Sequence, residues 1–129
     1  MGAVMDKSPE FYAKAFARLD SFANEPIGWN GCGGRPASAD VVAGVTAFLS
    51  SAFSHGLSEP SLVLGGDGHV SAVWQDNAGW YISADICDSK KYVFGISKIP
   101  DLMLRAGVAK TLEIDPLLAE YVPKVGGQL

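Results

Sequence analysis

The hydrophobic pattern of this chain changes once, near Ser61, from a helical repeat to an alternation at every second residue. From position 70 to position 96 the alternating residues all have even numbers: Val70, Ala72, Trp74, Trp80, Ile82, Ala84, Ile86, Tyr92, Phe94 and Ile96. One face of a sheet can hold all of them only if each connecting loop preserves this parity, as three-residue hairpin loops do. The pattern therefore predicts helices followed by an antiparallel sheet with one buried face.

Two helices are predicted before the sheet. The first starts at Ser8-Pro9, a favourable N-cap and first helical residue, and ends near Asn24. The second begins after Ser38 and ends at His55-Gly56, where glycine favours a left-handed cap. Each helix carries one apolar stripe, which is typical of core packing; a groove for a partner is the alternative for the first stripe.

Short polar loops separate the alternating segments, which predicts a meander of hairpins. The four predicted strands are Leu62–Leu64, His69–Gln75, Trp80–Cys87 and Lys91–Ser97. The weaker pattern beyond them indicates a helical turn over Asp101–Arg105, a fifth strand or an extended arm over Val108–Ile114, and a short helix over Leu117–Val122. The predicted fold is one α+β domain, residues 1–129. Two N-terminal helices pack on one face of a four-stranded antiparallel meander, and a short helical segment ends the chain.

Composition excludes several classes of function. The net charge is −4 and the ten Lys and Arg residues are scattered, so no basic stripe exists for phosphates and we expect no nucleic-acid partner. No apolar run approaches the roughly 20 residues that span a bilayer, and Met1–Asp6 shows no signal pattern. Cys32 and Cys87 lack CxxC spacing and fit a reducing compartment. We therefore expect a cytoplasmic protein without membrane partner, metal or cofactor.

The segment Gly28–Pro36, here called the glycine loop, separates the two predicted helices. A phosphate loop would need a strand before it, a helix directly after it and usually a lysine, and none of these is present. One interpretation is a tight connector in which Asn30-Gly31 turns the chain and Trp29 fills the seam between helices and sheet. The other is a ligand cleft in which Trp29 stacks on the ligand and Arg35 holds an anion.

The odd-numbered positions of the predicted strands form a mixed polar face. On that face a three-residue loop places His69 opposite either Asp85 or Cys87. A Cys-His-Asp set can activate a thiol or contribute metal ligands, yet three residues of moderate polarity also occur together on ordinary solvated faces. We assign no catalytic residue and no metal site. The candidate binding residues are Trp29, Asn30, Arg35, His69, Tyr81, Asp85 and Cys87.

Trp29-Asn30-Gly31 within Gly28–Ser38, followed by Asp67-Gly68-His69-Val70 and Trp74, resembles a loose group of small, uncharacterised bacterial and phage-associated proteins. That group has a core similar to GWDGYGAxPIS and a strand similar to dGxvxxxW, and the resemblance covers roughly residues 15 to 97. It implies a helix-plus-sheet fold and residence on mobile elements, without a settled activity. This chain has Asn30 where Asp is usual, Cys32 where an aromatic residue is usual and Gly34 where Ala is usual. Asn30 puts any chemical role of that Asp in doubt here.

Two hypotheses about function follow. The first is a small non-enzymatic interaction or accessory protein, encoded by a mobile element, that binds a protein partner or forms a homodimer. The alternative is a small-molecule-binding protein or minor enzyme with its cleft at Gly28–Pro36. The first is favoured because the sequence supplies few of the groups that the second requires.

Overall fold

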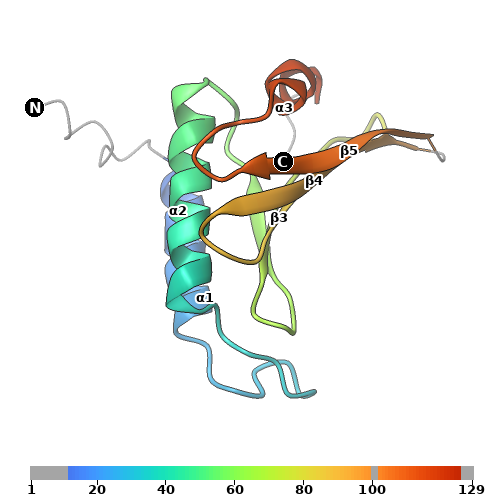
Figure 1. The fold of residues 1–129 in the computed structure, drawn as a ribbon. Coiled ribbons are helices and arrows are strands. Elements are labelled where there is room, and N and C mark those ends of the chain that lie inside the picture. The colour runs from blue at the N-terminus through green and yellow to red at the C-terminus, as the bar shows by residue number, and fades with distance from the viewer. Residues whose placement is uncertain (1–11, 100–101, 126–129) are drawn as a thin grey trace, which may run out of the picture.

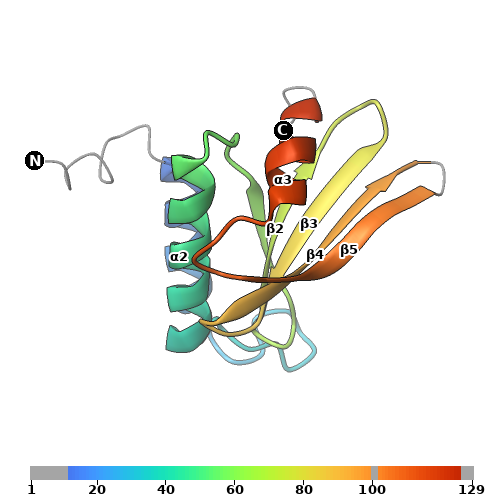
Figure 2. The same cartoon turned by 45° about the horizontal axis from the view of Figure 1, so that its top comes forward.

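A computed structural model describes residues 12–99 and 102–125 of the chain. Two helices, α1 (Ala13–Ala23) and α2 (Ala39–Ser54), lie side by side on one face of a strongly twisted sheet (Figure 1). A short helix α3 (Pro116–Tyr121) and the 3-10 turn η2 (Val122–Lys124) pack on the same face, as the tilted view of Figure 2 also shows. The fold is therefore α+β, with helices and sheet enclosing one core.

The sheet is an antiparallel meander with strand order β1-β2-β3-β4-β5. Its strands are β1 (Ser61–Leu64), β2 (Val70–Gln75), β3 (Trp80–Ile86), β4 (Lys91–Lys98) and β5 (Leu102–Lys110). In the register, Leu64 pairs with Val70, Trp74 with Ile82, and Ile86 with Tyr92. Each of these hairpins thus pairs even-numbered residues with even-numbered residues, which confirms the predicted buried face. Of the ten even-numbered residues, nine are buried and Trp80 is half-buried.

The prediction of four strands was wrong, because β5 adds a fifth beside β4. The predicted helical turn over Asp101–Arg105 was also wrong within the described residues, since β5 begins at Leu102. A register shift between Ile96 and Ser97 moves the core-facing positions of β5 to odd numbers, so that Gly107 lies opposite Phe94. A Cβ at Gly107 would approach the Phe94 ring to 3.0 Å, so β5 cannot carry a large side chain at this core-facing position. Pairing with β4 overrides its helix-favouring composition.

The ends of α2 and the start of α3 follow the predicted signals. The Ser38 side chain accepts a hydrogen bond from the Val41 N–H at 3.2 Å and starts α2, and Gly56 ends that helix with φ +76°. Asp115 accepts from the Leu117 N–H at 2.8 Å and starts α3 as predicted. The predicted start of the first helix at Ser8-Pro9 was wrong: Ser8 itself lies outside the described residues, but α1 begins only at Ala13, because its N-cap Tyr12 has a left-handed backbone with φ 46°. The end of α1 at Ala23 agrees with the prediction.

Helix α2 approaches the sheet most closely at Gly44. A Cβ at this position would overlap the carbonyl oxygen of Asp88 in the β3–β4 turn. One turn earlier, the Asp40 carboxylate accepts a hydrogen bond from the Ser89 N–H of the same turn at 3.2 Å. Gly44 is therefore present because a backbone carbonyl occupies the space of a side chain.

We expect Gly44→Ala to destabilise the protein, although alanine is the better helix former. Helix propensity alone would add about 1 kcal/mol of stability, whereas forcing a methyl group into a filled site costs about 1–3 kcal/mol. The free energy of unfolding in urea measures the balance, and Ser50→Ala on the exposed side of α2 is the matched control. A stability gain in Gly44→Ala would contradict the close approach.

Tyr92 is a fully buried tyrosine with its hydroxyl in a hydrogen-bond chain. Its hydroxyl accepts from the Asp115 N–H at 3.0 Å and donates to the Glu113 carbonyl at 3.4 Å. Burial raises the pKa of Tyr92 to about 12, against an ordinary pKa of about 10. The folded state therefore holds this proton more tightly than the unfolded state does.

The raised pKa gives Tyr92 a stabilising contribution that is complete below pH 10 and is lost as the pH rises from 10 towards 12. We expect Tyr92→Phe to lose less stability than the wild type between pH 9 and pH 11.5, although it starts about 1 kcal/mol lower at neutral pH because hydrogen bonds are missing. Urea unfolding at both pH values gives the slopes. Burial also raises the pKa of Tyr12, so part of the alkaline loss remains. Equal slopes in the two proteins would contradict the assignment.

Candidate functional site

The glycine loop is a rigid, hydrogen-bonded projection at the ends of α1 and α2 (Figure 1). The Gly28 N–H donates to the Gly34 carbonyl at 2.6 Å and closes the loop. Inside it, Oδ1 of Asn30 accepts from the Cys32 N–H at 2.9 Å and from the Gly34 N–H at 2.8 Å. The Asn30 oxygen is thus the centre around which the loop is folded.

Trp29 is half-buried, in contrast to the full insertion that a seam-filling tryptophan implies. Its ring packs against the edge of the core, and its Nε1–H donates to the Arg35 carbonyl at 2.8 Å. The Arg35 N–H in turn donates to the Gly66 carbonyl at 3.0 Å in the β1–β2 turn. Trp29 therefore fastens the loop to the body of the protein, and this geometry supports the connector interpretation over ligand stacking.

Asn30 and Gly34 each have a structural role in the loop. A carboxylate at position 30 would offer the same acceptor oxygen as the amide of Asn30, so the requirement at this position is an oxygen that accepts two backbone N–H groups. A Cβ at Gly34 would lie 2.6 Å from Asn30 Oδ1 and 2.8 Å from Trp29 Nε1. In this chain the loop is therefore too tight for alanine at position 34.

A pocket of about 230 Å³ lies where the glycine loop meets the β1–β2 turn and the end of β3. Arg35, Ser38, Asp67, His69 and Cys87 are among the residues that line it. Three of the predicted binding residues, Arg35, His69 and Cys87, are thus brought together. The other four, Trp29, Asn30, Tyr81 and Asp85, do not line this pocket.

The imidazole of His69 is held by Asp67. Nδ1 of His69 lies 3.1 Å from Oδ2 of Asp67, and Oδ1 of the same carboxylate accepts from the His69 backbone N–H at 3.0 Å. The register continues from Val70 opposite Ile86, which places His69 beside Cys87 rather than beside Asp85. The imidazole is thus joined to Asp67, and Cys87 lines the same pocket. Asp67 was not among the predicted binding residues, although the Asp-x-His spacing was the available signal.

The sheet face opposite the helices, here called the open face, is uncovered by any described element (Figures 1 and 2). Large apolar side chains are exposed on it at Val63 (49%), Tyr81 (42%), Val93 (45%) and Val108 (62%). Asp85 lies at its centre and accepts a hydrogen bond from the Ser71 hydroxyl at 2.6 Å. Tyr81 and Asp85 belong to this surface, which is more apolar than the predicted polar face.

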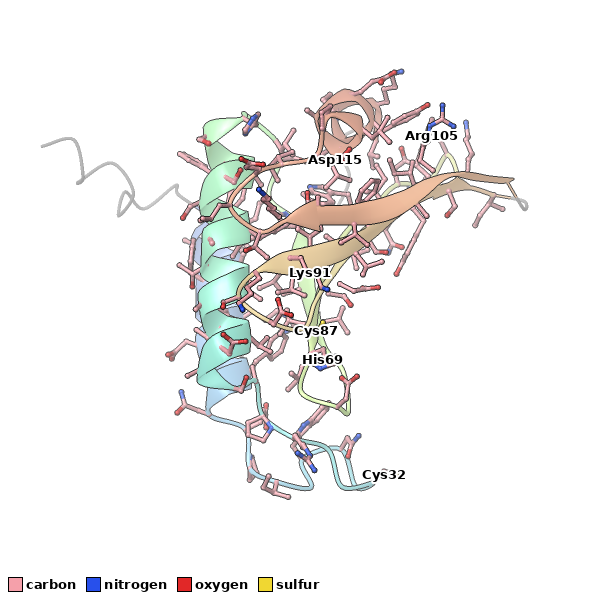
Figure 3. The ribbon with its side chains drawn as sticks, viewed as in Figure 1. Cys32, His69, Cys87, Lys91, Arg105 and Asp115 are labelled. Atoms are coloured by element: carbon pink, nitrogen blue, oxygen red, sulfur yellow. The ribbon has the colours of Figure 1, made fainter. Side chains whose placement is uncertain are left out.

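One end of the open face is basic. Lys91 of β4 lies directly opposite Lys110 of β5, and both side chains are exposed. Figure 3 shows His69, Cys87 and Lys91 in succession along this end of the sheet, while Cys32 lies apart at the tip of the glycine loop. The Cys87 thiol, the His69 imidazole and the Lys91–Lys110 pair therefore lie near one another at this end of the sheet.

A larger hollow of about 710 Å³ lies between α1 and the free edge of β1. Its polar groups are already engaged: Nε of Arg18 donates to the Leu62 carbonyl at 2.7 Å, and the Glu59 carboxylate accepts from the Ala15 N–H at 2.8 Å. These contacts protect the edge of β1 from pairing with another strand. The hollow is therefore a structural joint.

Within residues 12–99 and 102–125, no group of three or more His, Cys, Asp or Glu side chains is arranged to hold a metal ion. Likewise, none of the helices in the described part of the chain has the length and apolar character needed to cross a bilayer. Comparison with protein families, curated proteins and solved structures finds no match to this chain. Functional inference therefore depends on the geometry of the two surfaces.

The role of Asn30 as a double acceptor is testable by substitution. We expect Asn30→Asp to retain the wild-type stability within about 0.5 kcal/mol, whereas Asn30→Leu loses two hydrogen bonds and about 1–2 kcal/mol. Urea unfolding measures both, and Asn77→Leu in the exposed β2–β3 turn is the control for a change of polarity. The idea fails if Asn30→Leu is as stable as that control.

Proposed function

We propose that this protein is a non-enzymatic interaction module whose open face binds a protein partner. The observation that carries the proposal is the exposure of Val63, Tyr81, Val93 and Val108 on a sheet face that no described element covers. Val93 and Val108 are direct cross-strand neighbours on this face, with Val63 in the same row and Tyr81 further along β3. Exposed apolar side chains gathered on one face are typical of binding surfaces. The residues between them are mostly small, namely Ser71, Val73, Ser83, Asp85, Gly95 and Ala106.

The lysine pair indicates the chemistry of the partner. Like charges directly opposite each other in a sheet are destabilising, and Lys91 and Lys110 form such a pair. Asp85 is the one acidic residue within the five strands, and it is already hydrogen-bonded to Ser71. A partner with carboxylates around an apolar centre would neutralise the two lysines while covering the valines.

A second copy of this chain is the weaker candidate for the occupant. In a twofold interface the same surface patch is used on both chains. The lysine pair of one copy must therefore face some part of the open face of the second copy. The lysine pair would then meet either its own copy or the neutral end with Gln75, Tyr81 and Ser97. The one carboxylate that the strands of a second copy supply is Asp85, which already accepts from Ser71, and this favours a different, acidic protein.

The setting of the proposed function is an accessory role on a mobile element in the cytoplasm. The resemblance to phage-associated proteins supports the first part. The two unpaired and exposed thiols, Cys32 and Cys87, support a reducing compartment.

Site-specific cross-linking tests the proposal. A photoreactive benzoylphenylalanine is placed at Val93 in the full chain, and at Ser50 on the exposed side of α2 as the control. In lysate of the native host we expect one discrete heterologous adduct from position 93 and none from position 50. Replacing both Lys91 and Lys110 by Gln should weaken capture about tenfold, as expected for two ion pairs of up to about 1 kcal/mol each.

The outcomes separate the alternatives. An adduct of the chain with itself would replace the acidic partner by a homodimer, which sedimentation of the purified protein would confirm. The same adducts from positions 93 and 50, or none from position 93, would overturn the open face as the binding surface. Capture that is insensitive to the lysine substitutions would overturn the acidic nature of the partner.

A further inference from the structure

We infer that Cys87 is a reactive thiol, activated by the His69–Asp67 pair, which forms mixed disulfides with small disulfides that carry carboxylates. This site is the pocket beneath the glycine loop and does not depend on a partner at the open face. The inference is built from the imidazole, the position of the thiol and the cation beside them.

The contact with Asp67 determines which nitrogen of His69 is available. Because the carboxylate lies 3.1 Å from Nδ1, that nitrogen carries a proton, and Nε2 is left as the acceptor in the neutral ring. The same carboxylate also accepts from the His69 backbone N–H at 3.0 Å, so it is held by two contacts. A ring oriented in this way is a suitable base for a thiol.

The ladder between β2 and β3 places the thiol beside that base. His69 precedes Val70 and Cys87 follows Ile86, and Val70–Ile86 is the last pair of the ladder, so the two residues flank its end on neighbouring strands. Both residues line the pocket and both are exposed. The thiol and the imidazole therefore open on the same pocket.

Cationic side chains near Cys87 favour an anionic reactant. Lys91 follows on the β4 side, where the register continues, and Arg35 lines the pocket from the glycine loop. The adjacent Asp88 carboxylate accepts hydrogen bonds from the backbone N–H groups of Lys90 and Lys91 at 2.8 and 3.1 Å. These bonds lower the pKa of Asp88 and hold its carboxylate within the β3–β4 turn. Cations near a thiol increase its reactivity.

The reaction is a thiol–disulfide exchange. The Cys87 Sγ–H proton moves to Nε2 of His69, and the thiolate attacks one sulfur of the small disulfide. The new Sγ–S bond forms as the old S–S bond breaks, and the departing thiolate takes the proton from Nε2. Cys87 is oxidised and the small disulfide is reduced, so no further oxidant is needed. A carboxylate of the reactant lies against Arg35.

The chain contains its own matched control, because Cys32 is also exposed but lies on the glycine loop away from His69 (Figure 3). Cys32→Ser leaves only Cys87, and Cys87→Ser leaves only Cys32. Each variant is treated at pH 7 with 5,5′-dithiobis(2-nitrobenzoate), a dianionic disulfide, and with 2,2′-dithiodipyridine, a neutral one. We expect Cys87 to react with the dianionic reagent at least about tenfold faster than Cys32.

Two substitutions in the Cys32→Ser background assign the roles. His69→Gln should lower the Cys87 rate with both reagents, whereas Arg35→Gln should lower it only with the dianionic reagent. In 8 M urea the two thiols should react at equal rates, which links the difference to the folded site. Equal rates for Cys87 and Cys32 in the folded protein would overturn the reactive thiol. An unchanged rate in His69→Gln would overturn its activation by the imidazole, and an unchanged reagent preference in Arg35→Gln would overturn the anionic specificity.

Discussion

The packing of α2 against one face of the sheet is the interaction on which the rest of this structure depends. Phe48 is fully buried between Trp74 and Tyr92, with ring centroids 6.1 and 4.9 Å away, and a buried side chain of this kind contributes about 1.5–3 kcal/mol. Gly44 lets the same helix approach the carbonyl of Asp88. A single helix therefore orients β2, β4 and the β3–β4 turn together, and the strands between them follow.

Burial on one face determines where function can lie. With helices on the even-numbered face, the odd-numbered residues of β1 to β4 lie on the open face, where Val63 and Val93 are exposed and Val73 is buried. The pocket lies at the rim, where backbone contacts form its walls. The Arg35 N–H bonds to the Gly66 carbonyl at 3.0 Å, and Gly68 is so close to Pro36 that a Cβ would lie 2.8 Å from its carbonyl oxygen. Walls built from backbone contacts preorganise the side chains they carry.

Sequence analysis anticipated part of the candidate site. Parity placed His69 beside either Asp85 or Cys87, and the register selects Cys87. The acidic member was missed, because an aspartate in a glycine-rich turn has a sufficient backbone role, and Asp67 serves that role and holds the imidazole at once. The joining of Arg35 to these residues depends on a contact between two loops more than thirty positions apart, for which the local pattern contains no signal.

The sequence by itself determined the presence of the helices, the N-caps of α2 and α3, the buried face of β2 to β4 and the α+β class, because side-chain periodicity and capping are local properties. Only the tertiary structure decided the fifth strand, the half-buried position of Trp29 and the shared pocket. Each of these results from contacts that local sequence preferences do not specify. The register shift beside Ile96, the hydrogen bond from Trp29 to the Arg35 carbonyl and the docking of the glycine loop on the β1–β2 turn change which residues meet without changing their local preferences.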